Sequence, residues 1–376
     1  MNVLMISLDD SVFPGSEKAG NTLERMKAYL TALRKIDPES EITSLAFTRR
    51  RLEPFSPAEG LVFIPVKAPR IQLFPAAALF LILKNWKSFH PGVITSQSPF
   101  EPGLLGVLLK ALFKVPLEVQ VHVNYFSDFW LREHPWWNRI RILMARLVLK
   151  GADSVRVVSS VVRDELLNRF KIPEMKVVII PVPVFFRDEG DKAQTTSFDL
   201  PTSPGSKVVL FVGRLCFQKN LGGLFQVIEK ILSARSDVEF ILAGDGSERE
   251  ITEKKAAHLD KERIHVLGNV DYNHLARLYR HAEVIILPSL YEGFGRVVLE
   301  GYLFGTPSVA TRCGGPEDII EEGETGFLIE INDMVGFAER VLWLLDHPIE
   351  ASQFGARGRE IVQERFQMAC LIDKMV

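Results

Sequence analysis

The sequence predicts an α/β protein of two domains built on parallel sheets, and three observations lead to this prediction. Short apolar runs alternate with helical patterns along the chain, as in folds in which helices connect parallel strands. A length of 376 residues exceeds the usual size of one domain. The alternation stops once, at 187–207, where Ser, Thr, Pro, Gly and charged residues form a stretch typical of a linker.

The first domain is expected to span residues 1–190. A short apolar run predicts its first strand, and a loop with Gly and Pro leads into a helix from Thr22 to about Ile36. Helical patterns lie between most of the later strands. The expected strands of this half are 2–7, 42–47, 61–66, 92–97, 117–123, 154–160 and 176–182.

The second domain is expected over 191–361, where the same alternation begins again after the linker. Its predicted strands are 208–213, 238–244, 264–268, 282–288, 306–311 and 326–330. The remaining residues, about 362–376, have a helical period. In two-domain folds of this kind such a tail can pack back on the first domain.

The composition is that of a globular protein with a sizeable core, since 47% of the residues are hydrophobic and 24% are charged. Three widely spaced cysteines show no metal-binding spacing and no Cys-x-x-Cys motif, which favours free thiols in a cytoplasmic protein. Residues 1–190 carry 25 Lys and Arg against 19 Asp and Glu, whereas the rest carry 20 against 28. A basic first half favours an anionic partner, although a chance difference between solvated surfaces is the plainer explanation.

No secretory leader and no membrane span are expected. The apolar run after Met1 is short, has no basic residues before it and ends in Asp9 and Asp10, so it is better interpreted as a buried strand. The run at 73–83 contains a Pro and is too short to cross about 30 Å of hydrocarbon. A cytoplasmic protein is expected, with attachment to the inner face of the membrane as the open alternative.

One segment joins an apolar strand to a helix through a loop that contains two glycines. The strand is 282–288, Gly293 and Gly295 lie in the loop, and a helical pattern begins at Arg296. The first amides of a helix are free and lie at the positive end of its dipole. Glycines allow a ligand to approach the loop backbone closely. The segment is therefore a candidate site for an anionic group.

Two acids flank this loop, eight positions apart. Glu300 lies about one turn into the helix, where a carboxylate can accept hydrogen bonds from a ribose. Glu292 lies at the loop tip, near the edge of the sheet where ligands bind in doubly wound folds. Taken alone, the pair is equally consistent with solvated charges that the helix dipole stabilises.

Two cations follow the predicted strand 208–213. Arg214 comes directly after the strand and Lys219 at the start of the next helix. They could neutralise a diphosphate, Arg through its planar fork and Lys as a point charge, and an ordinary surface pair is the alternative. Turns at Gly244 and Gly314 also follow strands, and each is either part of a ligand pocket or a plain turn or cap.

Taken together, these motifs resemble the donor half of the family 4 glycosyltransferases, which have the GT-B fold. The resemblance covers nearly all of 207–365 and includes the family's Glu-x7-Glu element, here EGFGRVVLE. It implies two Rossmann-like, doubly wound domains that face each other across a cleft containing the active site. It also implies transfer of a sugar, with retention, from a nucleotide-diphosphate sugar such as a UDP or GDP sugar.

The resemblance implies roles for single residues of the second domain. Arg214 and Lys219 would hold the donor diphosphate. Glu300 would bind the ribose, and Glu292 would contact the donor sugar. The other residues implied in donor binding are Gly244, Gly293, Phe294 and Gly295, the last two through backbone amides near phosphate and sugar.

The first domain resembles the family's acceptor domain more loosely. His122 lies at the end of a predicted strand, where the family often keeps a histidine near the donor sugar, and a satisfied strand-end histidine is the alternative. The Gly-Gly pair that usually follows the first strand is replaced by PGSEKAGNT, which leaves Gly15 as the position for a donor contact. The Asn-Gly-Val-Asp turn near the linker is replaced by IIPVPVFF.

No metal and no other cofactor are expected. Many glycosyltransferases hold a metal ion with Asp-x-Asp, and this sequence contains no Asp-x-Asp. Charge that develops on the leaving phosphate would then be stabilised by Arg214, Lys219 and the amides before Arg296. The prediction is metal-independent transfer.

The acceptor is expected to bind the first domain. Residues 122–137 mix aromatic rings with charges and could stack on a sugar or lie on a membrane surface. A basic amphipathic pattern at 138–150 and an apolar segment with basic flanks at 70–87 point the same way, although core helices are the commoner explanation. A glycan, a glycolipid or a lipid-linked acceptor of cell-surface polysaccharide or glycolipid synthesis fits this pattern.

Rival functions differ in what they require. A nicotinamide dehydrogenase needs Gly-x-Gly-x-x-Gly after an early strand, and the sequence does not provide it there. An epimerase or phosphorylase of the GT-B fold, or a non-catalytic sugar-nucleotide-binding protein, would share most of these features, although the intact cations and acids disfavour a decayed site. Nucleic-acid binding is disfavoured because the pI is about 6.5 and no recognition motif is present.

Overall fold

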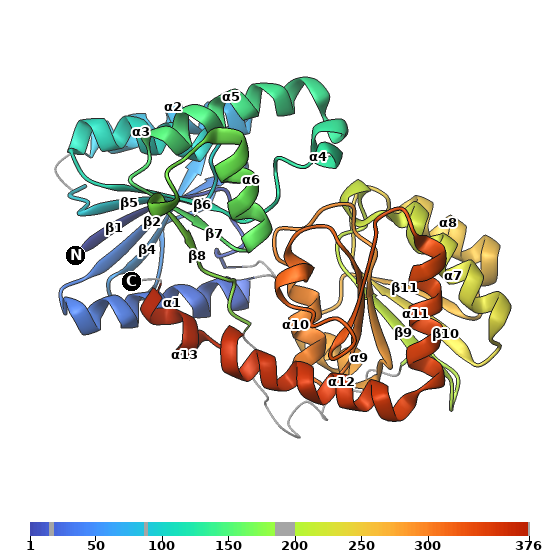
Figure 1. Cartoon of the computed structure of the whole chain (residues 1–376). Helices are drawn as coiled ribbons and strands as arrows, with labels where there is room; N and C mark the ends of the chain where they lie inside the picture. Colours follow the sequence, from blue (N-terminus) through green and yellow to red (C-terminus); the bar gives the residue numbers. More distant parts are fainter. Residues whose placement is uncertain (15–18, 86–88, 185–199, 375–376) are drawn as a thin grey trace. The chain divides into compact units, whose positions relative to one another are not determined.

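The computed structural model describes residues 1–14, 19–85, 89–184 and 200–374. These residues form two compact units, each with its own sheet (Figure 1). The N-terminal unit comprises Met1–Phe126, His134–Pro181 and Leu371–Val376, and the C-terminal unit comprises Ser127–Glu133 and Val182–Cys370. Gly15 and most of the predicted linker lie outside the described residues.

The described residues of the N-terminal unit form an eight-stranded sheet in the order β3-β4-β2-β1-β5-β6-β7-β8. Neighbours are parallel except β3 and β4, which are antiparallel. The strands are β1 (Asn2–Ser7), β2 (Glu41–Thr48), β3 (Phe55–Ala58), β4 (Leu61–Lys67), β5 (Val93–Ser96), β6 (Leu117–Val121), β7 (Ser154–Val157) and β8 (Val177–Ile179). The seven predicted strands are all present. β3 was missed because it is short and contains Pro57, which only an edge strand tolerates.

Some strands end earlier than the apolar pattern suggests. β7 was expected to reach residue 160 but ends at Val157. Ser159 is the N-cap of α6 (Ser160–Phe170), and its hydroxyl accepts a hydrogen bond from the Val162 amide at 3.4 Å. A capping residue belongs to the start of a helix, so the strand stops before it.

Helices cover both faces of this sheet. From β1 the chain adds strands toward β4 on one side and then from β5 to β8 on the other, so right-handed connections place helices on opposite faces. Figure 1 shows α1 (Ala19–Ile36) on one face and α2 (Phe74–Lys84), α3 (Glu101–Phe113) and α5 (Pro135–Gly151) on the other. Between α1 and the sheet, Met26, Leu30 and Phe63 belong to one buried apolar cluster.

The apolar run at 73–83 forms most of α2, a short helix that is apolar on both its buried and its exposed faces. Phe74, Ala78 and Ile82 are buried, whereas Phe80 and Leu83 are exposed. Within the part of the chain that the structure describes, no helix has both the length and the apolar content needed to cross a bilayer.

The described residues of the C-terminal unit form a six-stranded parallel sheet in the order β11-β10-β9-β12-β13-β14. The strands are β9 (Lys207–Val212), β10 (Val238–Ala243), β11 (Ile264–Gly268), β12 (Val284–Leu287), β13 (Ser308–Thr311) and β14 (Gly326–Ile329), as predicted to within a few residues. The strand order reverses between β9 and β12. In open parallel sheets ligands bind beyond the carboxyl ends of the strands at such a reversal. The loops after β9 and β12 therefore lie where a site is expected.

Helices also pack on this second sheet. They are α7 (Leu221–Ala234), α8 (Arg249–Asp260), α9 (Tyr272–His281), α10 (Arg296–Leu303), α11 (Met334–Asp346) and α12 (Pro348–Ile361). Apolar residues of α7 and α11, including Ile228 and Phe337, share one buried cluster with Phe211 of β9. This core holds β9 in place, and the loop that carries Arg214 and Lys219 directly follows this strand.

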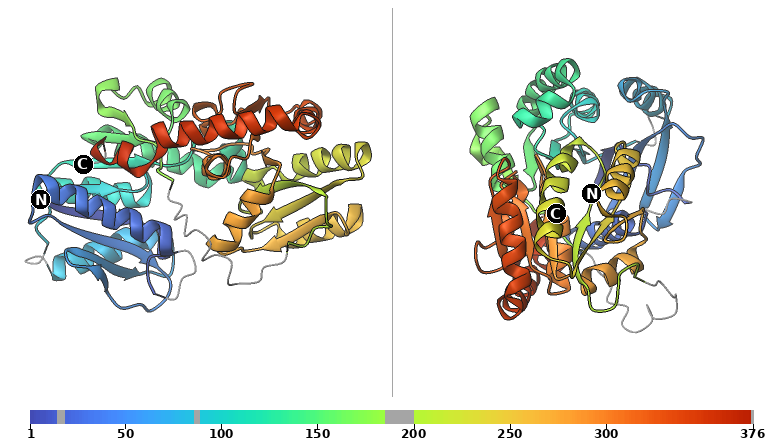
Figure 2. Two further views of the ribbon diagram at one scale, coloured as in Figure 1. Left: turned by 90° about the horizontal axis from the view of Figure 1, so that it is seen from below. Right: turned by 90° about the vertical axis from the view of Figure 1, so that its right-hand side faces the viewer.

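The sequence predicts a helical tail after residue 361, and the structure shows an interrupted one. α12 continues into the π-helical turn η7 (Val362–Phe366), Gln367 is extended, and α13 (Met368–Leu371) and the 3-10 turn η8 (Ile372–Lys374) follow. Figure 2 shows α12 and η7 as one nearly continuous rod. The residues from Leu371 count with the N-terminal unit, where η8 contacts α1.

Candidate active site

A buried ion pair links the loops that follow β9 and β12. Lys219 ends the 3-10 turn η5 (Phe217–Lys219), and its ammonium group donates to Oε1 of Glu292. Both side chains are only 10% exposed. The Ser289 hydroxyl donates to the same oxygen at 2.8 Å. Because little water screens this pair, it holds the Glu292 carboxylate firmly between the two loops.

Gln218 connects Arg214 to this pair, and sequence analysis did not identify it. Its amide oxygen accepts from Nη2 of Arg214 at 2.9 Å, and its Nε2 donates to the Tyr291 carbonyl oxygen at 2.9 Å. Gln218 is buried, whereas Arg214 is exposed. A glutamine before a lysine is an ordinary surface pattern, so only the fold shows that this amide orients a guanidinium that a ligand can reach.

Two loops lie backbone against backbone at this site. The Glu292 amide donates to the Cys313 carbonyl oxygen at 2.8 Å. A Cβ at Gly314, where φ is +129°, would lie 2.3 Å from the Glu292 carbonyl oxygen. A Cβ at Gly315 would lie 2.0 Å from Cα of Phe294. Only glycine fits at both positions, so the Gly-Gly pair determines the path of the loop that carries Glu292.

The N-terminus of α10 lies directly after this loop. Gly295, with φ of +87°, precedes the helix, and no side chain caps it. Glu300 is 8% exposed, and its two oxygens accept from the Tyr279 hydroxyl at 2.7 Å and from Arg296 Nη2 at 3.0 Å. Each carboxylate oxygen can accept more than one hydrogen bond, so Glu300 keeps capacity for a ligand. Uncapped amides and an oriented acid thus lie within one turn of each other.

Gly244 supports the loop after β9 from behind. Its φ is +149°, and a Cβ there would lie 1.8 Å from the Gly213 carbonyl oxygen. A Cβ at Gly213 would in turn lie 3.0 Å from Cε of Lys219. Gly244 therefore packs on Gly213, which in turn packs on the Lys219 side chain. The direct contact with the donor that was expected of Gly244 stays a prediction.

A short helix from the first half of the sequence counts with the C-terminal unit. This helix is α4 (Asp128–Glu133), and Oε2 of Glu133 accepts a hydrogen bond from the Tyr291 hydroxyl at 2.5 Å. Burial, followed by the bond to Glu133, raises the pKa of Tyr291 well above its ordinary value. Because Tyr291 precedes Glu292, this bond ties α4 to the loop after β12.

Two titratable groups in the loop after β13 have raised pKa values. Burial raises the pKa of Glu317 to about 7, although both of its oxygens accept from the Gly314 amide, at 3.0 and 3.2 Å. Burial and then the charge of Glu292 raise the pKa of the Cys313 thiol well above its usual range. Cys313 is thus a thiol rather than a reactive thiolate at neutral pH.

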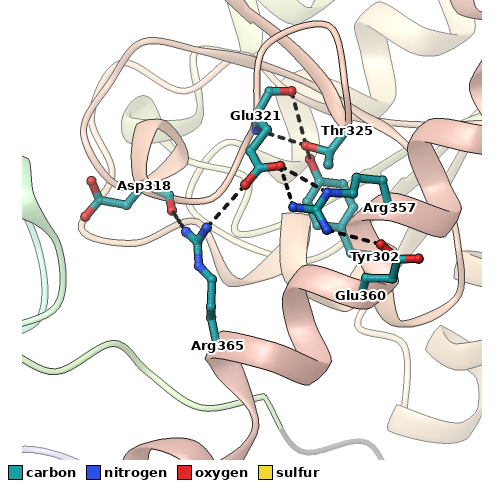
Figure 3. A network of polar contacts seen from close by, with 7 residues as sticks. All are labelled: Tyr302, Asp318, Glu321, Thr325, Arg357, Glu360 and Arg365. Carbon is teal, nitrogen blue, oxygen red and sulfur yellow. Dashed lines mark hydrogen bonds and ion pairs between the residues drawn. The ribbon is translucent and has the colours of Figure 1, made fainter.

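A polar network ties the same loop to the end of α12 (Figure 3). Glu321 accepts from Arg357 at 3.2 Å and from Arg365 at 3.3 Å. Phe366 packs edge-on against Phe294, with ring centroids 5.7 Å apart. The π-turn that carries Arg365 and Phe366 therefore contacts two loops of the candidate site.

The remaining predicted residues, His122 and Gly15, belong to the N-terminal half. His122 follows β6, and its Nε2 lies 3.0 Å from Oε1 of Gln120. Desolvation, followed by the charges of Arg156 and Arg25, lowers the pKa of His122 to about 3, so the ring is neutral at neutral pH. Gly15 lies outside the described residues, and its donor contact stays a prediction.

No metal-binding cluster of three or more His, Cys, Asp or Glu residues occurs within the ranges that the structure describes. The sequence has three Asp-x-Glu pairs, at Asp37, Asp237 and Asp260, and each aspartate makes other contacts, Asp237 with Arg235 at 2.7 Å. Asp37 binds the N-terminal amine, and Asp260 pairs with Arg263 at 2.7 Å. The two acids of the candidate site, Glu292 and Glu300, are each bonded to a cation.

Comparison with known proteins shows the family to which the chain belongs. Residues 192–361 match the model described as glycosyl transferases group 1, and residues 31–183 match the glycosyl transferase 4-like domain. The 2-deoxystreptamine N-acetyl-D-glucosaminyltransferase of Niallia circulans is 31% identical over 310 residues, which cover 79% of this chain and 78% of the relative. The chain belongs to the family 4 (group 1) glycosyltransferases.

Other glycosyltransferases of this type agree in sequence or in fold. The alpha-D-kanosaminyltransferase of Streptomyces kanamyceticus is 25% identical over 281 residues, 71% of each chain. Sucrose-phosphate synthase from Thermosynechococcus elongatus superposes with a TM-score of 0.83 at 20% identity, over 100% of this chain and 97% of that one. HepE of Anabaena, solved in complex with UDP, gives 0.71 at 17% identity, over 100% and 98%. The fold is GT-B, so the predicted fold class and family are confirmed.

Proposed function

We propose that this glycosyltransferase moves a sugar from a nucleotide-diphosphate sugar to a glycan, glycolipid or lipid-linked acceptor, with retention and without a metal ion. Family membership supports the type of reaction. The observation that carries the proposal is the arrangement after β9 and β12, where the buried Lys219–Glu292 pair lies beside the exposed guanidinium of Arg214.

Arg214 would be the main cation for the donor diphosphate. It is bonded to the neutral amide of Gln218, so its positive charge is not neutralised by an acid there. Lys219 shares its charge with Glu292 and would contribute less. The uncapped amides of α10 would bind the remaining phosphate oxygens. As the bond between sugar and diphosphate breaks, these fixed groups would stabilise the charge that develops on the leaving phosphate.

Glu292 and Glu300 would bind hydroxyl groups of the donor. Oε1 of Glu292 receives both Lys219 and Ser289, whereas Oε2 has only Gln218 at 3.5 Å, so Oε2 is the oxygen with room for a sugar hydroxyl. Glu300 would accept from the ribose. The neutral ring of His122 would be a hydrogen-bonding partner of the donor sugar rather than a cation, as the family resemblance implies.

Ligand-dependent thermal unfolding tests the donor site. UDP, GDP and their sugars would be added, with a chelator present, to the wild type, to Arg214→Ala and to Lys230→Ala, a control that removes one positive charge elsewhere in the same unit. A ligand that binds only the folded state raises the unfolding temperature. We expect one nucleotide to raise it in the wild type and the control but not in Arg214→Ala. A wild type that responds to none of them would contradict the donor site.

The chemical step needs two further measurements. The anomeric configuration of the new glycosidic bond, read by proton NMR, should equal that of the sugar in the donor, and an inverted product would exclude retention. Activity should be unchanged by a chelator. Activity that a chelator abolishes and a divalent cation restores would exclude metal-independent transfer. Turnover of the nucleotide sugar without a glycosylated second molecule would favour an epimerase, and binding without any turnover would favour a non-catalytic binding protein.

The acceptor side of the proposal includes a membrane contact through the N-terminal unit. α3 contacts α2 and α5, and the three helices lie on the same face of the sheet (Figure 1). Large apolar side chains are exposed on all three. They are Phe80, Leu83, Leu108, Leu112, Trp136, Trp137, Ile140, Leu143 and Leu147, here named the α2/α3/α5 surface. Large exposed apolar side chains on neighbouring helices are typical of an interaction site.

Charge on these helices favours an anionic bilayer as the partner. α2, α3 and α5 contain six Lys and Arg but only one acid, Glu101, which is buried. Apolar side chains interspersed with cations are typical of segments that lie in the interface of an anionic membrane. We infer that the protein is cytoplasmic and attaches to the inner face of the membrane through this surface.

Sedimentation with vesicles tests this contact. We expect binding to vesicles that contain phosphatidylglycerol, weakened by salt, and little binding to pure phosphatidylcholine. Leu143→Asp should reduce it strongly, whereas Val335→Asp, an exposed control in the C-terminal unit, should not. Binding that is unchanged in Leu143→Asp would contradict the surface, and a lipid-free dimer lost in Leu143→Asp would assign it to a second copy.

A further inference from the structure

One charged side chain of the N-terminal unit is buried without a partner. Arg156 lies in β7, and only 4% of it is exposed. Its Nε is enclosed without a hydrogen-bond partner, and no ion pair within the described residues includes it. Arginine stays protonated in proteins, so a full positive charge is buried at this position.

Such a side chain is unfavourable for folding. Arginine is almost never fully buried unless it is paired, and a buried donor without an acceptor loses its bonds to water with no replacement. Proteins retain unfavourable groups of this kind mainly where they serve function. Arg156 is therefore better explained by binding than by the stability of the sheet.

The polar side chains near Arg156 are already bonded to one another. Gln120 is its register partner in β6. Nε2 of Gln120 donates to Thr95 at 3.0 Å and to Glu118 at 2.7 Å. The acid of this network, Glu118, also accepts from Thr95 at 2.9 Å rather than from the guanidinium. The network is satisfied without Arg156 and leaves its charge uncompensated.

The electrostatic field at this place is positive. The lowered pKa of His122 has burial as its main cause, and the charges of Arg156 and Arg25 lower it further. Two cations thus act on one imidazole, which stays neutral beside them. The single N–H of the neutral ring is used in the bond to the Gln120 oxygen, so the groups that could attract an anion here are the two arginines.

Arg156 also lies where ligands bind in this class of sheet. It is in the carboxyl-terminal half of β7, and His122 directly follows β6. β6 and β7 are parallel neighbours, so both strands end at the same edge. In open α/β sheets ligands bind beyond that edge, near the reversal of strand order, which in this sheet lies between β1 and β5.

We propose that the N-terminal unit binds an anionic group of the acceptor, a phosphate or a carboxylate, with Arg156 as its main cation. The planar fork of an arginine bonds two oxygens of such a group at once. The assignment of this group to the acceptor rests on the proposed function, whereas the anion site itself does not.

Inorganic phosphate tests the anion site directly. The full chain with Arg214→Ala, which removes the proposed donor cation, would be unfolded thermally in phosphate and in chloride at equal ionic strength. We expect phosphate to raise the unfolding temperature, because it binds the folded state. Adding Arg156→Met should abolish this rise. Adding Arg163→Met, at a less buried arginine of the same unit, should leave it unchanged.

A second variant covers the case in which Arg156→Met does not fold. Arg156→Lys keeps the charge but loses the planar fork, so its rise in phosphate should be smaller than that of the parent. A rise that survives both variants in full would overturn the inference. The absence of any rise in the Arg214→Ala chain would overturn it as well.

Nucleotide binding separates this inference from the proposed function. In the chain with native Arg214, Arg156→Met should leave the Kd of UDP and GDP unchanged. A nucleotide affinity that Arg156→Met weakens would assign the anion to the donor and overturn the acceptor assignment. A protein that binds phosphate through Arg156 but binds no nucleotide would retain the anion site and lose the proposed transferase function.

Discussion

Each unit buries a cation near the carboxyl edge of its sheet, and the two cations differ in their surroundings. Lys219 in the C-terminal unit is 8% exposed and is paired with Glu292. Arg156 in the N-terminal unit is 4% exposed and has no acidic partner among the described residues. The C-terminal unit neutralises its buried charge internally, whereas the N-terminal unit leaves its charge uncompensated.

This difference separates two ways of preparing a site. A neutralised pair can be assembled before any ligand arrives, so the loop with Glu292 is already in place. An uncompensated charge lowers stability until an anion binds, so its site is completed by the ligand. Replacing Lys219 should therefore lower the free energy of unfolding, whereas replacing Arg156 should raise it.

The largest expected effect comes from breaking the pair. Lys219→Met leaves the Glu292 carboxylate buried without its cation, and removing one partner of a buried pair costs about 3–5 kcal/mol. Urea unfolding of the variant and the wild type measures this loss. The double variant Lys219→Met with Glu292→Leu removes both charges and should recover most of it. A single variant as stable as the wild type would mean that the pair is not buried.

Arg156→Met should change stability in the other direction. Removing an unpaired buried charge while keeping a similar side-chain volume should increase the free energy of unfolding by about 1–3 kcal/mol. The matched variant Arg163→Met, at a less buried arginine, should stay within about 0.5 kcal/mol of the wild type. Urea unfolding without phosphate measures both. A clear loss of stability in Arg156→Met would show that Arg156 has a structural partner and would end the comparison.

A smaller effect is expected where α4 holds the loop of the C-terminal unit. Tyr291→Phe removes the donor of the bond to Glu133 and should cost about 1.5 kcal/mol, because the acceptor is charged. Glu133→Gln keeps an acceptor of similar shape and should cost less. Urea unfolding gives both values, and equal stability of Tyr291→Phe and the wild type would show that α4 does not hold this loop.

The smallest effect concerns the pH dependence of the same region. The folded pKa of Glu317, about 7, lies above its ordinary value of 4.5, so between these values the folded state binds more protons than the unfolded state. Stability from this group is complete below the ordinary value and is lost as the pH rises toward about 7. This fall in the free energy of unfolding should be about 1 kcal/mol, since Glu317 is partly exposed, and Glu317→Gln should remove it. An unchanged pH dependence of urea unfolding in Glu317→Gln would contradict the raised pKa.

The strands and the main site residues were predictable for a simple reason. Buried parallel strands are nearly continuous apolar runs, and their carboxyl ends meet at one edge. Residues that directly follow β9 and β12, such as Arg214 and Glu292, therefore had to lie near each other. The Gly-Gly-Pro turn after β13 indicated a tight loop, and the structure contains a close backbone contact there, between Gly314 and Glu292.

The partners of these residues could not be predicted, because they depend on register and packing between distant segments. Gln218 and Tyr279 bond to Arg214 and Glu300 only in the folded chain. Arg156 was read only as part of a strand, since an isolated sequence does not show which neighbour faces it. Its burial and its lack of a partner become visible only when β6 and β7 are paired.

The contacts of η7 have a consequence for the order of synthesis. Arg365 donates a hydrogen bond to Glu321, and Phe366 packs on Phe294. Both residues follow all the described strands of the two sheets in the sequence. The ribosome synthesises the chain from its N-terminus, so all strands of the second sheet are translated before η7. While this segment is still in the exit tunnel, the loops that carry Phe294 and Glu321 lack these two contacts. In a nascent chain these loops therefore gain the two contacts only after η7 has left the exit tunnel.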